Sequence, residues 1–179
     1  MSNLMGNRPL EEVMQAEFER LGPVAFDAGD EAFAREIQTT LTEEDIAATF
    51  RRIGRAPEPG MALCDFVAPL DRPADGGEGS TDVGDVSWAV PTVQARVATC
   101  AVGTPFHTWQ TVAQGKAPAA HKGMIYAAKV MAATARSLIE QPAIVEAAQA
   151  EHNAKLEKVP YACPIPPEIG PPILPDPSA

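Results

Sequence analysis

Histidines are the side chains of this sequence best suited to proton transfer or metal ligation, because imidazole titrates near neutral pH and binds metals through either ring nitrogen. The sequence has three of them. His107 follows a predicted strand and a Gly-Thr-Pro turn at 103–105, at the kind of strand end where α/β proteins hold ligands. Taken alone, it could ligate a metal, or it could be a loop histidine bonded to a neighbouring carbonyl.

The other two histidines stand on predicted helices. His121 lies in the first turn of a long helix, where its imidazole could face the same cavity as His107 and where a helix start favours anions. The alternative for His121 is a partly exposed first-turn residue with no function. His152 is surrounded by polar residues, so we expect it on the solvated surface.

Acidic and aromatic residues accompany these histidines. Asp82 and Asp85, in the segment GSTDVGDVS, could bind a metal or a substrate ammonium, or could bond only to their own loop amides. Trp88 and Trp109 could stack on an aryl substrate or belong to the core. The motifs H-E-x-x-H, G-x-S-x-G, G-x-G-x-x-G and the Walker loop are missing, so no self-sufficient catalytic motif is present.

Composition limits the classes of function. A chain of 179 residues is enough for one ordinary domain. Its net charge of −10 argues against a nucleic-acid partner, because such binding depends on Lys and Arg displacing counterions. No apolar run approaches the roughly 20 residues that span a bilayer, and the first residues lack a basic segment followed by an apolar one. We therefore expect a soluble, cytoplasmic protein without a membrane partner, with its three widely spaced cysteines reduced.

Apolar residues spaced three and four apart predict five helices, within residues 8–21, 30–41, 42–54, 118–139 and 142–158. In the third, Thr42 and Asp45 form a capping box. In the fourth, the charged residues Lys122, Lys129 and Arg136 recur every seven positions and leave one narrow polar stripe. That stripe predicts extensive burial of this helix.

Three β-rich segments, 61–70, 86–89 and 93–102, predict strands of one sheet. A polar loop at 71–85 separates the first segment from the second. The expected fold class is therefore α/β, with a partial mixed sheet flanked by helices. We assign residues 1–158 to one domain. Residues 159–179 form a separate tail, because eight of the 18 prolines lie between positions 160 and 177 and predict extended or disordered chain.

Four segments occur in an order that is similar to a known family. They read S-T-D-x-G-D-V-S-W, G-T-P-x-H-[ST]-W-Q, A-Q-G-K and A-H-K-G-M. The sequence resembles the aminoacylase and carboxypeptidase-type dinuclear metal amidohydrolases, and among them the subfamily formed by the B subunit of p-aminobenzoyl-glutamate hydrolase. The resemblance runs from about residue 7 through the YACPIP segment.

The resemblance implies a carboxyl-terminal half of a zinc-peptidase-like catalytic domain, without the lid and dimerisation domain. It implies two divalent metals, zinc or manganese, in the complete enzyme. The late histidine ligand of such enzymes matches His107 best, and His121 is the second choice. In the first assignment, His121, Asp82 and Trp109 would contact substrate or support the ligands. The family's earlier G-x-H-x-D-x-x-P segment and its glutamate pair are missing, so the general base is expected outside this chain.

The function implied is metal-dependent hydrolysis of an N-acyl or aminobenzoyl amino-acid amide, with this chain inactive alone. The missing amino-terminal half or a partner subunit would complete the enzyme as a homo- or hetero-oligomer. Two alternatives stay open at this stage. One is a non-catalytic half-domain that acts as an interaction or scaffold protein. The other is a binding module for an anionic small molecule that needs no metal.

Overall fold

The structure is a computed structural model that describes residues 2–71, 81–163 and 165–170. Its helices are α1 (Arg8–Leu21), α2 (Ala28–Gln38), α3 (Glu43–Arg52), α4 (Val83–Ala89), α5 (Trp109–Gln114), α6 (Pro118–Glu140) and α7 (Pro142–Lys158). The predicted helices at 8–21, 118–139 and 142–158 are confirmed almost to the residue. The other two are confirmed with shifted ends, whereas the sequence pattern does not predict α4 and α5.

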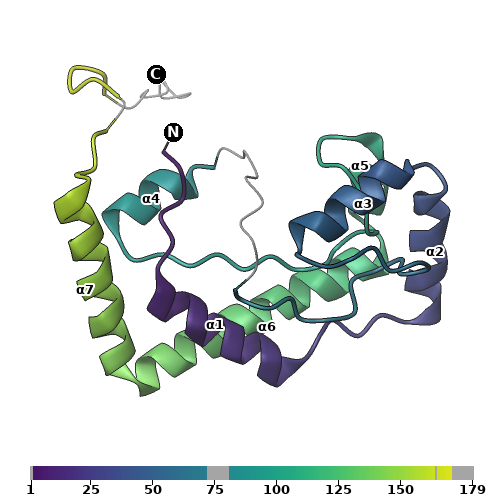
Figure 1. Cartoon of the computed structure of the whole chain (residues 1–179), viewed down its shortest axis with the longest axis horizontal. Coiled ribbons are helices and arrows are strands. Elements are labelled where there is room, and N and C mark those ends of the chain that lie inside the picture. The colour runs from purple at the N-terminus through teal and green to yellow at the C-terminus, as the bar shows by residue number, and fades with distance from the viewer. Residues whose placement is uncertain (1, 72–80, 164, 171–179) are drawn as a thin grey trace, which may run out of the picture.

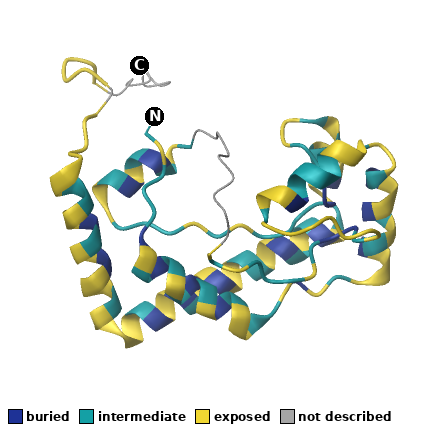
Figure 2. Cartoon of the chain, viewed as in Figure 1, coloured by how far each residue is buried: buried dark blue, intermediate teal, exposed yellow. Residues whose placement is uncertain are grey.

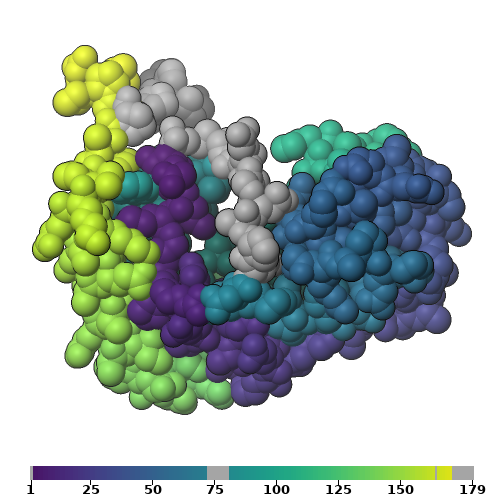
Figure 3. Space-filling view, in the orientation of Figure 1, coloured from purple at the N-terminus to yellow at the C-terminus, as the bar shows by residue number. Residues whose placement is uncertain are grey.

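The long helix α6 connects the two ends of the molecule (Figure 1). Helix α1 packs along α6 and also contacts α7. Helices α4 and α7 stand at one end, where Figure 3 shows the amino-terminal segment, in purple, against the yellow-green α7. Helices α2, α3 and α5 gather at the other end. No described helix has the length and apolarity needed to cross a bilayer.

The core at the α2 end is built from small and medium-sized apolar side chains. Ala34 and Ile37 of α2 pack with Ala62 and Leu63 from the irregular segment after α3. Ala119 of α6 completes the cluster. At the α7 end, α1, α6 and α7 bury their facing residues: Leu10, Met14, Val130 and Ala148.

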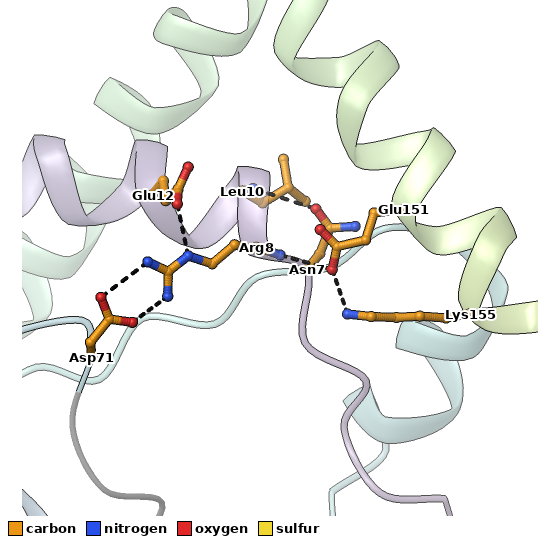
Figure 4. Close-up of polar contacts among 7 residues, drawn as sticks. All are labelled: Asn7, Arg8, Leu10, Glu12, Asp71, Glu151 and Lys155. Carbon is orange, nitrogen blue, oxygen red and sulfur yellow. Dashed lines mark hydrogen bonds and ion pairs between the residues drawn. The ribbon is translucent and has the colours of Figure 1, made fainter.

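Polar contacts hold the start of α1 against α7 (Figure 4). Asn7 is 1% exposed and caps the helix, because its Oδ1 accepts from the Leu10 amide at 3.4 Å. Its Nδ2 donates to the Ala148 carbonyl on α7 at 2.9 Å. The Arg8 amide donates to Glu151 Oε1 of the same helix at 3.2 Å. One buried side chain therefore caps α1 and joins it to α7.

The predicted α/β fold is wrong, because the described residues contain no strand. Residues 86–89 belong to α4, and the segments 61–70 and 93–102 form no helix or sheet. One backbone bond joins these two segments, from the Val102 amide to the Ala62 carbonyl at 2.8 Å. A strand exists only when a neighbour extends the hydrogen-bond ladder, and β-rich composition alone supplies no neighbour.

The predicted loop at 71–85 and the predicted tail at 159–179 fall partly on residues 72–80, 164 and 171–179, which lie outside the described chain. The predicted end of the loop at residue 85 is wrong, since α4 begins at Val83. The described part of the tail has no helix and is exposed. The division into a domain and a tail stays a prediction.

The prediction that the fourth helix is extensively buried is also wrong for one of its faces. Val130 and Thr134 are buried against the body of the molecule, whereas Met124, Ile125 and Met131 are each more than half exposed. Figure 2 shows buried and exposed residues alternating along α6. Apolar composition indicates burial, but the described chain contributes no element to cover this face.

Candidate functional site

The residues from Ala101 to Gln114 form a braced loop that presents His107, and we call them the His107 loop. Its turn depends on Gly103, which has a φ of +96°. A Cβ added there would lie 2.7 Å from Ile46 Cγ1. Glycine is therefore required both by the left-handed backbone and by the close approach of α3.

Gln114 of α5 holds the two ends of the loop together. It is 3% exposed, and its Oε1 accepts from the Ala101 amide at 2.7 Å. Its Nε2 donates to Thr104 Oγ1 at 3.1 Å and to the Gln110 carbonyl at 3.0 Å. Both the oxygen and the nitrogen of this buried side-chain amide are therefore hydrogen-bonded, which holds the loop in its conformation.

Two threonines brace the turn immediately around His107. The hydroxyls of Thr108 and Thr111 each donate to the Pro105 carbonyl at 2.7 Å. His107 itself has a φ of +63°, the left-handed region that costs a non-glycine residue about 1 kcal/mol or more. A braced loop that holds a histidine in this conformation is typical of a functional position.

The imidazole of His107 faces solvent. It is exposed, and in the described chain its ring makes no hydrogen bond or ion pair. Phe106 and Trp109 beside it are 68% and 60% exposed. Trp109 is therefore not a core residue, and the loop offers one imidazole and two aromatic rings to whatever binds there.

The A-H-K-G-M motif lies at the start of α6, with His121 in the first turn. The two residues that follow His121, Lys122 and Gly123, have packing roles. Lys122 Nζ lies 2.6 Å from Asp27 Oδ2 and also pairs with Asp30, which lowers the pKa of Asp27 and raises that of Lys122 through hydrogen bonding. A Cβ on Gly123 would lie 2.2 Å from the Ala98 carbonyl oxygen. The His121 side chain is exposed and makes no hydrogen bond or ion pair among the described residues, so packing does not explain it.

The S-T-D-x-G-D-V-S-W motif clamps the amino-terminal segment. Ser87 Oγ accepts from the Met5 amide at 2.8 Å, and Trp88 Nε1 donates to the Asn3 carbonyl at 2.9 Å. Asp85 Oδ1 accepts from the Ser2 amide at 3.2 Å, and this bonding lowers the pKa of Asp85. These motif residues have structural roles.

Asp82, the remaining candidate of this motif, is exposed at the start of α4, and its side chain does not cap the helix. Helix α4 lies at the opposite end of the molecule from α5 (Figure 1). The structure therefore does not bring Asp82 together with the His107 loop.

The described residues do not complete a metal site. No group of three or more His, Cys, Asp or Glu side chains in ranges 2–71, 81–163 and 165–170 is placed to hold a metal ion. Catalytic zinc needs about three protein ligands. Burial raises the thiol pKa of Cys64 and Cys100 above the ordinary value. No such set of ligands forms among the described residues, so we assign no catalytic step to them.

Sequence reasoning misplaces His152 and misses Gln114. The polar surroundings of His152 predict a surface position, but it is 3% exposed, with Nε2 3.1 Å from the Ser87 carbonyl oxygen. Helix α4 covers it, and nothing in the local sequence predicts that contact. The role of Gln114 has a weak signal, because the residue belongs to the A-Q-G-K segment that marks the resemblance.

Fold and site together define a helical chain that presents an exposed histidine on a braced loop without completing a catalytic centre among its described residues. Comparison with known proteins finds that it is 39% identical over 180 aligned positions to the B subunit of p-aminobenzoyl-glutamate hydrolase from Escherichia coli (strain K12). The match covers 95% of this chain but 37% of that protein. The chain thus spans little more than a third of the length of its relative.

No protein-family model matches the chain. No solved structure matches it either. The similarity to the E. coli protein nevertheless confirms the family resemblance carried by the ordered motifs. The chain is related to the family of p-aminobenzoyl-glutamate hydrolase B subunits over almost all of its residues.

Proposed function

We propose that this chain is part of a hydrolase that cleaves the amide bond of p-aminobenzoyl-glutamate or a similar N-acyl amino acid. The relative's name supports the reaction and the substrate class. The observation that carries the proposal is the His107 loop. Its hydrogen bonds brace a turn in which the His107 backbone is left-handed and the imidazole is exposed.

His107 would serve as one ligand of a divalent metal, zinc or manganese, whose remaining ligands come from polypeptide outside this chain. A bound metal would supply polarisation of the amide carbonyl. His121 and Trp109, both exposed, would contact substrate or support the ligands, and Asp82 would reach the site only if the assembled protein brings α4 toward it. The general base also lies outside the chain, so the chain alone is inactive.

The partner in this proposal is the remainder of a polypeptide like the E. coli relative, or a separate subunit, and the assembly acts in the cytoplasm. The part-length match supports the need for a partner, since more than half of the relative has no counterpart here.

The test is release of p-aminobenzoate from p-aminobenzoyl-glutamate, with zinc or manganese supplied. The chain is assayed alone and co-expressed with the part of the E. coli relative that lies outside the match. Activity is expected only from the co-expressed pair. His107→Ala should abolish it and reduce the bound metal measured by elemental analysis. Val145→Ala, on the exposed surface of α7, is the control and should change neither quantity.

Each other result contradicts a part of the proposal. A folded pair without activity under either metal would overturn the hydrolase and favour the scaffold alternative. Full activity and full metal content in His107→Ala would remove His107 from the site. Metal-independent binding of the substrate, lost in His107→Ala, would favour the module for an anionic ligand.

A further inference from the structure

The side of α6 that faces away from α1 is apolar along most of the helix. Its exposed residues, which we call the outer face of α6, are Met124, Ile125, Ala128, Met131, Ala132, Ala135 and Ile139. They follow one another at spacings of mainly three and four, which places them on one side of the helix. No charged residue interrupts this stripe.

The exposure of the large side chains in this face is substantial. Met124 is 57% exposed, Met131 60% and Ile139 79%. Single exposed apolar residues are ordinary, but a contiguous stripe on a helix marks a contact surface. Alanines 128, 132 and 135 lie between the larger residues. Small residues in the middle of a helix face let a second element approach closely.

Charge restricts what can cover this face. Lys129 and Arg136 are exposed along one edge, and α6 has no acidic residue before Glu140, whose Oε1 lies 3.8 Å from Arg136 Nε. A second copy packed antiparallel by two-fold symmetry would bring like edges together, with Lys129 of one copy near Arg136 of the other. That arrangement is repulsive. A surface that carries acidic residues beside its apolar contacts fits better.

The length comparison supplies a candidate for this partner, namely the part of the relative's polypeptide that has no counterpart in this chain. The matched region is 37% of the E. coli relative, so the relative's equivalent of this chain has a long polypeptide to pack against. An interface formed in that way resembles a domain core cut in half, with an apolar face and a polar edge. The outer face of α6 has this character.

We propose that the outer face of α6 docks onto the part of a hydrolase polypeptide like the E. coli relative that this chain does not contain, through an apolar surface edged with acidic residues. The choice of partner rests on the proposed function. Docking would cover Met131 near the middle of the face and leave His107 to be joined by ligands from the partner.

The experiment uses the full chain co-expressed with an affinity-tagged E. coli polypeptide that covers the unmatched part of the relative. We expect the two to purify together as a one-to-one complex. Met131→Glu should weaken the complex at least roughly tenfold, because it places a charge in a desolvated contact. Val145→Glu is the matched control, since Val145 is 48% exposed on α7 and outside the face.

A second readout guards against a substitution that unfolds the chain. Cys163 is exposed and is first replaced by serine, so that labelling reports on the new position. In the Cys163→Ser background, the cysteine introduced by Ala132→Cys should react with a maleimide in the isolated chain and be protected in the complex. Absence of a complex, or a complex that Met131→Glu does not weaken and in which the introduced cysteine stays reactive, would overturn the proposal. So would a dimer of the isolated chain, seen by sedimentation, that Met131→Glu dissociates, because a second copy would then occupy the face.

The docking proposal and the proposed function can fail separately. A complex that is sensitive to Met131→Glu but does not hydrolyse the substrate supports docking and counts against the hydrolase. Hydrolysis by a complex insensitive to that substitution supports the hydrolase and overturns docking through α6.

Discussion

His152 of α7 holds its Nε2 3.1 Å from the carbonyl oxygen of Ser87 on α4, and this contact joins two helices through residues that are 65 positions apart in the sequence. The ring is 3% exposed, and its Nδ1 is buried without a hydrogen bond in the described chain. With its proton on Nε2, the imidazole donates to Ser87. The α4 end of the molecule therefore depends on a histidine that has no place in the proposed hydrolytic site.

His152→Ala should destabilise the chain by about 2–3 kcal/mol, because it leaves a cavity and removes the donor to a buried carbonyl. Urea unfolding followed by circular dichroism measures the loss. His121→Ala is the matched control, since His121 is exposed, and it should change stability by less than about 0.5 kcal/mol. Equal effects of the two substitutions would show that α4 does not cover His152 in solution.

Gly123→Ala should destabilise the chain by about 1–3 kcal/mol, the usual range for overpacking, although alanine favours helices. The added Cβ would lie 2.2 Å from the Ala98 carbonyl oxygen and 2.8 Å from Thr99 Cγ2, so the segment that leads to the His107 loop must shift. Gly115→Ala provides the comparison. Its Cβ would meet the Val112 carbonyl oxygen at 3.5 Å, an ordinary contact, and its φ is −61°. Thermal unfolding of both variants should show a lower Tm for Gly123→Ala alone.

Acid should destabilise the chain by protonating Glu17, which is 7% exposed. Hydrogen bonds from Ser137, at 2.6 Å, and Arg20, at 2.7 Å, lower the pKa of Glu17 below its ordinary value of 4.5. A carboxyl whose pKa is lower in the folded chain stabilises it fully above the unfolded value. That stabilisation is lost as the pH falls from about 4.5 through the folded pKa.

The measurement for Glu17 is the urea midpoint between about pH 6 and pH 3, a window that brackets the ordinary carboxyl pKa. Ser137→Ala should lower stability at the upper end of this window and reduce its further loss in acid, because the folded pKa moves back toward the ordinary value. Glu17→Gln should remove this residue's part of the pH dependence. A pH profile that neither substitution changes would contradict the assignment.

The helices are predictable because their signals are local. Thr42 and Asp45 form the expected capping box, with the Asp45 amide 3.1 Å from Thr42 Oγ1 and the Thr42 amide 2.9 Å from Asp45 Oδ2. Strands are not predictable in this way, because a strand depends on a partner from another part of the sequence. Residues 93–102 have β-rich composition, yet in the described chain they meet 61–70 through one backbone bond.

The candidate site is predictable only in part. The ordered motifs identify His107 and the loop around it, and the structure shows why the loop needs Gly103 and Gln114. The sequence places Asp82 in the same site, but α4 lies far from α5 (Figure 1). A motif records that residues occur together in a family, and it does not say whether each one contacts ligand or supports packing.

His107→Gly should stabilise the chain by about 0.5 kcal/mol while removing its proposed metal ligand. The φ of +63° strains any residue with a Cβ, and the relief exceeds the entropy that glycine adds to the unfolded chain. Phe106→Gly is the matched control, because Phe106 is 68% exposed and its φ is not positive, so it should destabilise. Urea unfolding compares the two variants. A loss of stability in His107→Gly equal to that in Phe106→Gly would mean that the loop does not hold His107 in the left-handed conformation, and the backbone argument for a functional position would fall with it.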